Sequence, residues 1–262
     1  MSLVNGLHQA KLIGAQLSWT ENSTNHVGAT ARADLRRANL SGAELMTAYL
    51  RGVDLSAADL HGAHLHGAHL SDAILAKANF SQADLSGVKL SGVNLSGANM
   101  HLANLKSANL MQLDLSRMNL QGANLHGVDL SQANLSQADL RQADLSRAVM
   151  VGTTLNGADL KGSNLKRASL AQANLSESQL QRVNLQGADL TQANLSRADL
   201  SQANLTQAYL IGTKLSKAIL SKAILIGAKI KGAELEGAVG FNKELLSRET
   251  VQPLPSPDLN KG

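Results

Sequence analysis

Four histidines close together in the sequence are the side chains best suited to chemistry, and they are His61, His64, His66 and His69. On an extended segment, residues two apart point to the same side, so His64 and His66 would present two imidazoles together. Metal sites use that spacing. The sequence shows no obvious residues to orient these rings from behind, as metal centres require. We therefore interpret the cluster as solvated surface histidine and predict no metal, although the spacing itself is also compatible with a metal site.

Nucleophilic catalysis requires a nucleophile, a base and a residue that orients the base, all in a cavity that excludes water. Ser, His and Asp recur along the chain, but the repetition described below guarantees their presence, and no set of three stands out. The chain contains no Cys, which excludes disulfides and thiolate chemistry. We predict a protein that is not an enzyme, with no catalytic residue and no cofactor.

A five-residue unit must position all these side chains. From residue 35 to residue 235 there are 41 central positions five residues apart, and 37 of them are Leu. The exceptions are Phe80, Met100, Met150 and Ile230. Two residues before the centre, 30 of 41 residues are Ala, and one residue before it, 25 of 41 are Asn or Asp. So strict a period has to be interpreted before any local propensity.

A period of five fits neither regular element. On an α-helix, successive leucines would be rotated by about 140°, and on a flat strand they would point to opposite faces. A chain that bends once per unit can turn every Leu toward one side, with the Ala two residues earlier beside it. Asn and Asp can bond the local backbone at each bend. Stacked coils about 4.8 Å apart then form a β-solenoid.

The tandem units, as in Ala133-Asn134-Leu135-Ser136-Gln137-Ala138-Asp139-Leu140, resemble the pentapeptide-repeat family over roughly four-fifths of the chain. The resemblance implies an all-β fold, a right-handed quadrilateral parallel β-helix with four pentapeptides per coil. On that count the 41 units make about ten coils. Stacking of this kind would also place Glu44 and Asp84 directly above and below His64.

The sequence predicts four segments. Residues 1–17 form an N-terminal coil or cap, residues 18–30 a projecting loop, and residues 31–240 the β-helix. Residues 241–262 form a C-terminal cap with a short helix, followed by a disordered tail that contains all three prolines. Trp19, the only Trp, lies in the loop. It either folds over the open end of the leucine column or contacts a partner.

Apolar residues gather at outer positions near the C-terminal end of the repeats. They are Tyr209, Ile211, Ile219, Ile224 and Ile226, each one residue before or after a centre. An exposed apolar patch of this kind requires an explanation. Either the segment after residue 240 folds back and covers it, or it is a surface for a partner protein or for a homodimer formed through the C-terminal coils. In both cases the last coil must be blocked, because a bare edge would stack end to end.

Three functions are compatible with these features, and a non-catalytic scaffold or protein-interaction rod is the one that we favour. The resemblance to the family suggests an alternative, a DNA mimic that protects topoisomerases such as gyrase. Residues 31–240 carry 20 Lys and Arg against 16 Asp and Glu, a net charge of +4 that cannot imitate DNA. Nucleic-acid binding, suggested by the pI of about 9.4, is not favoured because aromatic residues for base stacking are scarce.

The chain begins without the basic and apolar regions of a secretion signal, and no apolar run approaches the roughly 20 residues of a membrane helix. We therefore expect a cytoplasmic protein that does not enter a membrane. The partner that we expect is another protein.

Overall fold

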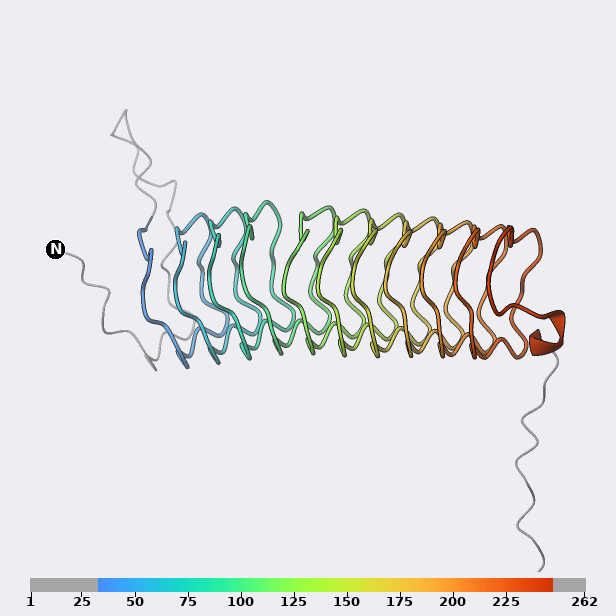
Figure 1. Cartoon of the computed structure of the whole chain (residues 1–262). Helices are drawn as coiled ribbons and strands as arrows, with labels where there is room; N and C mark the ends of the chain where they lie inside the picture. Colours follow the sequence, from blue (N-terminus) through green and yellow to red (C-terminus); the bar gives the residue numbers. More distant parts are fainter. Residues whose placement is uncertain (1–32, 247–262) are drawn as a thin grey trace, which may run out of the picture.

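The computed structural model describes residues 33–246, which wind into a stack of similar turns along one axis (Figure 1). Parallel bridges join the Asn/Asp positions to the residues 20 positions later, beginning with Asp34↔Asp54 and ending with Ile219↔Val239, with the single exception of Asn94 and Asp114. A turn therefore takes four pentapeptides, as the family resemblance implies. The predicted segments 1–17 and 18–30, with Trp19, lie outside the described residues, as does the tail from residue 247 onward.

The centre of the stack is filled by the central side chains. From Leu40 to Leu225 none of them is more than 2% exposed, and the Ala two residues before each centre is buried beside it. Leu35, Ile230 and Leu235, at the two ends, are only partly buried. Every fifth side chain therefore points into one column, which confirms the main prediction from the period of five.

One repeat unit illustrates the hydrogen bonds that hold neighbouring turns together. Leu140 N–H donates to Asp159 O at 2.7 Å on the following turn, and Asp139 N–H donates to Met118 O at 2.9 Å on the preceding one. Within the unit, Ala143 N–H donates to Leu140 O at 3.1 Å and closes a tight bend. Most backbone groups are thus satisfied between turns, so stacking rather than strand propensity maintains the fold.

The bends use the Asn and Asp side chains in the way that the sequence predicts. Asp144 Oδ1, for example, accepts from Ser146 N–H at 3.0 Å, and most other units repeat this contact. Asn side chains also bond from turn to turn. Asn124 Nδ2 donates to Asn104 Oδ1 at 3.0 Å, and Asn104 Nδ2 donates to Asp84 Oδ1 at 2.9 Å. These ladders satisfy polar groups that lie half-buried on the wall.

The second residue after each centre adopts a left-handed backbone conformation. The set includes 24 residues other than Gly, such as Gln142 and Arg147, both with φ of 59°. That conformation is uncommon for residues with a side chain. Here the bend repeats in every unit and neighbouring turns stabilise it, so long side chains are accepted at the corners.

Polar substitutions at the Ala position remain buried because each hydroxyl finds a carbonyl. Thr153 Oγ1 donates to Leu130 O at 2.8 Å, and Thr213 Oγ1 donates to Leu190 O at the same distance. Ser163 and Ser178 donate to the carbonyl three residues earlier, at 2.8 and 2.7 Å. The hydrogen bond removes the cost of burying an isolated hydroxyl.

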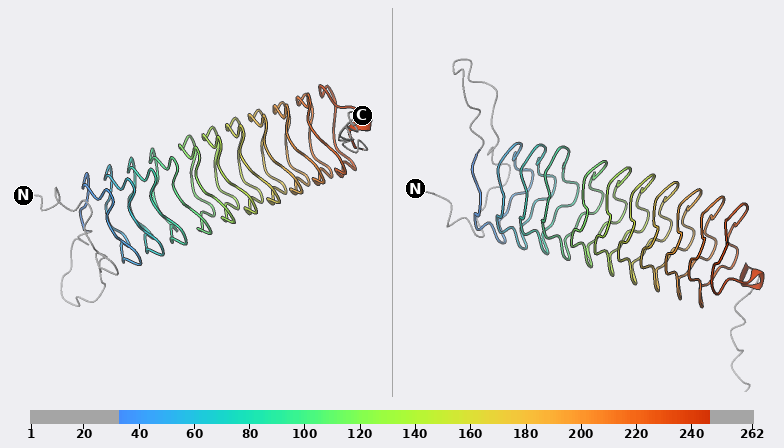
Figure 2. Two further views of the ribbon diagram at one scale, coloured as in Figure 1. Left: turned by 90° about the horizontal axis from the view of Figure 1, so that it is seen from below. Right: turned by 45° about the horizontal axis from the view of Figure 1, so that its top comes forward.

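The stack is interrupted once, between residues 90–97 and 109–116, and Figures 1 and 2 show a wider space there between the cyan and green turns. The N–H groups of Leu95, Gly97 and Asp114 make none of the bonds that their equivalents make in other turns of the described chain. Val93 and Leu113 both lie two residues before a centre, where most units have Ala. They are 20 residues apart, so these two larger side chains stack on each other. We call this interruption the seam.

The C-terminal end closes with a short turn of helix. Gly240, with φ of 79°, leads the chain away from the last turn, and the 3₁₀ helix η1 covers Lys243–Leu246. Phe241 and Leu246 pack, half-buried, against the end of the core. η1 is the only helix of residues 33–246, and nothing in that range forms a helix long and apolar enough to cross a membrane.

Candidate interaction surface

The structure places the histidine cluster on the outer wall near the N-terminal end. The parallel bridges Glu44↔His64 and His64↔Asp84 set the three residues one above the other, in the register that the resemblance implies. Being in register does not make a metal site, and within residues 33–246 no group of three or more potential ligands could hold an ion. His61 Nδ1 instead contacts Ser81 Oγ at 3.0 Å, and the ring of His69 lies 4.8 Å from that of Tyr49.

The environment of Asp84 explains how these histidines are used. Partial burial of Asp84 favours its neutral form, but hydrogen bonds from Ser86 and Asn104 and the charge of His66 outweigh burial and lower the pKa of the carboxyl group. His66 Nδ1 is itself 2.9 Å from Ser86 Oγ. The cluster therefore forms side-chain pairs between adjacent turns, and its rings contact Ser and Tyr neighbours.

The apolar residues of the C-terminal turns are exposed to different degrees. Tyr209, Ile211, Ile219 and Ile224 are 47%, 39%, 38% and 42% exposed, whereas Ile226 is half-buried. The bridges place them on three ladders, since Tyr209 pairs with Asp189 and Lys229, Ile219 with Asp199 and Val239, and Ile224 with Asn204. The side chains therefore form a band around three walls. We call these five residues the apolar band.

The C-terminal cap closes the end of the stack and leaves the walls uncovered. Gly227 N–H donates to Leu246 O at 3.1 Å, which holds η1 against the last turn. With every residue up to Leu246 in place, Tyr209, Ile211, Ile219 and Ile224 are still exposed. Of the two explanations for the apolar residues, a cap built from residues 241–246 does not account for them.

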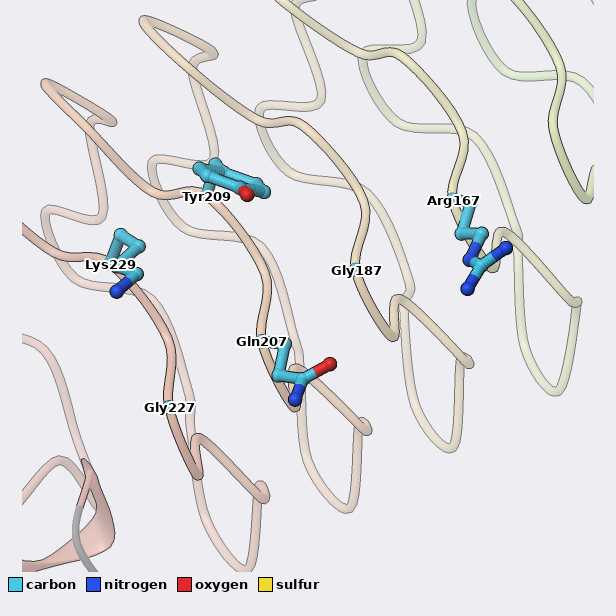
Figure 3. Close-up of a pocket in the computed structure, with 6 residues that line it drawn as sticks. All are labelled: Arg167, Gly187, Gln207, Tyr209, Gly227 and Lys229. Carbon is cyan, nitrogen blue, oxygen red and sulfur yellow. The ribbon is translucent and has the colours of Figure 1, made fainter.

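A shallow trough runs along one corner beside the apolar band. Its volume is about 480 Å³, and Figure 3 shows its lining: Arg167, Gly187, Gln207, Tyr209, Gly227 and Lys229. These residues belong to four successive turns, with Arg167 at one end and Lys229 at the other. Residues 167, 187, 207 and 227 are equivalent corner positions on successive turns. Arg167 and Gln207 carry long side chains there, whereas Gly187 and Gly227 carry none, so the corner is hollow at every second turn.

The two cations of the trough have no ionic partner among residues 33–246, in contrast to those on the neighbouring ladder. There Arg141 Nη2 lies 2.6 Å from Asp139 Oδ2, and Lys161 Nζ lies 3.4 Å from Asp159 Oδ2. The hydrogen bond from Arg141 is the main reason that the pKa of Asp139 is lowered. No carboxylate of the described chain lies within ion-pair distance of Arg167 or Lys229, so their charges are available to a ligand.

Sequence reasoning identified Tyr209 but missed the rest of the trough. Arg167 and Lys229 enter the sequence analysis only within the count of 20 Lys and Arg, and Gln207 does not enter it at all. The missing information is the register. Gly187, Gln207 and Gly227 are 20 residues apart, so they form one corner only when a turn holds four units. Given that register, the two glycines on either side of Gln207 would have indicated a hollow.

Comparison with known proteins supports the architecture. The family model "Pentapeptide repeats" matches with 8 copies over residues 31–67, 63–101, 98–137, 129–167, 163–202 and 203–239. The chain is similar to the solved structure of HetL, a pentapeptide repeat protein involved in heterocyst differentiation regulation from the cyanobacterium Nostoc sp. strain PCC 7120. The two are 38% identical over 79% of this chain and 89% of HetL, with a TM-score of 0.52.

Two further solved structures are similar over part of the chain. QnrB1, a plasmid-mediated fluoroquinolone resistance protein, is 17% identical over 82% of this chain and 92% of its own, with a TM-score of 0.39. Rfr23, a pentapeptide repeat protein from the cyanobacterium Cyanothece 51142, is 26% identical over 52% of this chain and 86% of its own, with a TM-score of 0.26. No curated protein matches the chain significantly.

Proposed function

Because the chain belongs to the pentapeptide repeat family, whose fold is a right-handed β-helix, we propose that it is a non-catalytic rod that binds another protein through its C-terminal turns. With 20 residues in a turn, we infer a stack of about ten turns, close to 50 Å long. A rod of this kind acts by presenting ordered side chains to a partner. We propose that it does so in the cytoplasm.

The observation that supports this function is the exposure of the apolar band. On the walls of the preceding turns the same positions are mostly Asn, Asp and Ser, which form ladders along the rod. At the C-terminal turns they become Tyr and Ile without becoming buried. Exposed apolar residues gathered in one region are typical of a protein-binding surface. The occupant that we propose is a partner protein, and a second copy of this chain is the alternative.

The charge distribution argues against the DNA-mimic alternative. Such a role needs rows of carboxylates along the rod, because duplex DNA carries one negative charge per about 1.7 Å. Here Asp139 and Asp159, which lie on one ladder, are each within ion-pair distance of Arg141. Arg147, Lys166 and Arg167 on another wall have no acidic partner within the described residues. We do not propose topoisomerase protection.

The proposal predicts that polar substitutions in the apolar band abolish association. The test variant is the triple change Tyr209→Ser, Ile211→Ser and Ile224→Ser. We expect it to fold as the parent does, because these side chains lie outside the core. We also expect it to lose the proteins that the parent captures from native extract, or the parent's oligomeric mass by light scattering. Both measurements are required because they separate a foreign partner from a second copy.

Tyr49→Ser is the matched control. Tyr49 occupies the same position of the repeat as Tyr209, on the same wall, and is 46% exposed, but it lies far from the C-terminal turns. It should leave captured proteins and mass unchanged. If the triple variant captures the same proteins and has the same mass as the parent, the apolar band is not a binding surface and the proposal is wrong.

A further inference from the structure

One corner of the rod collects cations without acidic neighbours. It is formed by the two residues that follow each centre on the ladder of Leu105, Leu125, Leu145 and Leu165. From residue 46 to residue 227 these corner positions contain no Asp or Glu. They do contain four cations within four successive turns, which we call the basic corner: Lys106, Arg147, Lys166 and Arg167. The trough begins at the last of them.

The carboxylates nearest in register to this corner bond to other groups. Asp144 Oδ1 accepts from Ser146 N–H at 3.0 Å and from Asn164 Nδ2 at 2.9 Å. Asp189, which precedes Tyr209 in its ladder, accepts from Thr191 N–H at 3.0 Å and from Thr191 Oγ1 at 2.6 Å. None of the four cations lies in an ion pair with any residue between 33 and 246. The cations of the corner therefore have no ion-pair partner within the described residues, and an anionic ligand can pair with them.

The trough adds shape and an apolar surface to this charge. Arg167 and Lys229 stand three turns apart, which is about 14 Å along the axis. Between them lie the half-exposed ring of Tyr209 and the amide of Gln207, and Gly187 and Gly227 leave space on the turns on either side of Gln207 (Figure 3). An extended polypeptide rises about 3.3 Å per residue, so about four residues span the two cations.

We propose that the basic corner and the trough together bind an extended acidic segment of a partner protein, which lies along the rod axis. The inference rests on the proposed role as a protein-binding rod and specifies the chemistry of the partner. Two carboxylates about four residues apart pair with Arg167 and Lys229, and an apolar side chain between them packs on Tyr209. Further acidic residues extend over Lys166, Arg147 and Lys106.

The arrangement fits a polypeptide better than a nucleic acid. Nucleic-acid surfaces combine a broad basic groove with several aromatic side chains on which bases stack. Here the cations follow a single convex corner, and Tyr209 is the one aromatic residue that lines the trough. A flat anionic surface such as a membrane would contact the corner along a line and could not enter the trough. An acidic segment can follow the corner and fill the hollow.

The test is a titration of the full-length protein with a labelled synthetic peptide, followed by fluorescence anisotropy. The peptide carries two glutamates about four positions apart with a leucine midway, flanked by further glutamates on the side that faces the basic corner. We expect saturable binding that weakens as salt is added. Arg167→Glu and Lys229→Glu should each weaken it at least about tenfold, because each replaces an attraction with a repulsion. Glu177 already occupies the same backbone position as residue 167.

Lys217→Glu is the matched control. Lys217 has no ion pair within the described chain, has the same left-handed backbone, and lies on the wall opposite the trough. It should leave affinity unchanged. A second variant, Gly187→Gln with Gly227→Gln, fills the trough without altering charge. Glutamine adopts this conformation at Gln192 and Gln207, so the variant should fold and yet lose binding.

Three results would overturn the inference: no binding of the peptide, equal loss with Lys217→Glu, or tighter binding of duplex DNA or phosphatidylserine vesicles with the same sensitivity to Arg167→Glu. The proposed function fails separately. It fails if the triple variant of the apolar band keeps every partner, whatever the peptide does. If that variant loses its partners while the peptide does not bind, the rod binds proteins but the basic corner and trough do not recognise acidic segments.

Discussion

Gly240 is the residue whose replacement the structure forbids most clearly. A Cβ added there would lie 2.8 Å from both the N and Cα atoms of Ser221 and 3.0 Å from the carbonyl carbon of Leu220. These are backbone atoms of the preceding turn, so they cannot move aside as a side chain can. The glycine lets the chain leave the stack closely enough for Phe241 and η1 to pack on its end.

We predict that Gly240→Ala destabilises the C-terminal turns by about 1–3 kcal/mol, the range for a strained backbone site. Thermal unfolding monitored by circular dichroism measures the change, and exchange of the Gly227 amide, which bonds to Leu246, localises it.

Gly62→Ala provides the comparison for this prediction. Gly62 also has a positive φ, of 62°, but a Cβ there meets nothing within 4 Å, and Ala57 adopts nearly the same conformation. This control should cost little. Equal effects of the two substitutions would mean that the left-handed conformation alone is costly and that the contact with Leu220 and Ser221 is not.

Residue types predicted the hydrogen bonds at the bends but not the left-handed backbone conformation that follows each centre. The Asn and Asp positions do bond the local backbone at the bends, as their chemistry suggests. The left-handed conformation of Gln142 and Arg147 was not predictable, because neither residue prefers it in isolation. It arises from the bend that all units share. The trough at Gly187 and Gly227 was missed for a related reason, since its lining comes from residues 20 apart.

At the scale of single turns, the seam shows how the buried position two residues before each centre controls the stacking. Ala at this position allows turns to approach to the spacing of paired strands. Val93 beneath Leu113 requires more room, and overpacked sites relieve strain through backbone shifts. The hydrogen bonds that Leu95, Gly97 and Asp114 would make are among those that are lost.

Amide hydrogen exchange should be faster at the seam than one turn further along. We predict weak protection for Leu95 and Gly97 and strong protection for Leu115 and Arg117, which donate to Asn134 O and Ser136 O at 2.7 and 2.9 Å. The paired change Val93→Ala with Leu113→Ala restores the Ala that most units have at this position. It should reduce the difference in amide protection between the two levels. Similar protection at both levels in the parent protein would contradict this interpretation of the seam.

The period of five was enough to predict a solenoid at this scale, but the seam could not be predicted from it. Val93 and Leu113 are visible in the sequence as departures from Ala, yet nothing in the period shows that they stack on each other. That follows from the number of units per turn. The period gives only the bend of one unit, so the number four came from the family resemblance, and the bridges between residues 20 apart agree with it.

In the whole molecule, the stacked turns hold the surface side chains in fixed positions, and the exposed side chains determine what the rod binds. Contacts are made between adjacent turns, so stability is approximately a sum over turns and their interfaces. A surface change therefore leaves distant turns intact. The apolar band and the trough share Tyr209, so the isoleucines test the band alone, and Arg167 and Lys229 test the trough alone. The fold itself does not specify a partner. The exposed isoleucines and the unpaired cations of the C-terminal half provide the evidence for protein binding.

Distances between spin labels test the central claim, that each successive turn takes 20 residues and advances along one axis. The chain has no Cys, so labels attach only at introduced positions. Ser116 and Ser216 lie on one ladder five turns apart, and Ser56 and Ser216 eight turns apart. The account predicts separations of about 24 and 38 Å, increasing by about 4.8 Å per turn, with a small addition from the seam. Two separations of similar length would contradict it.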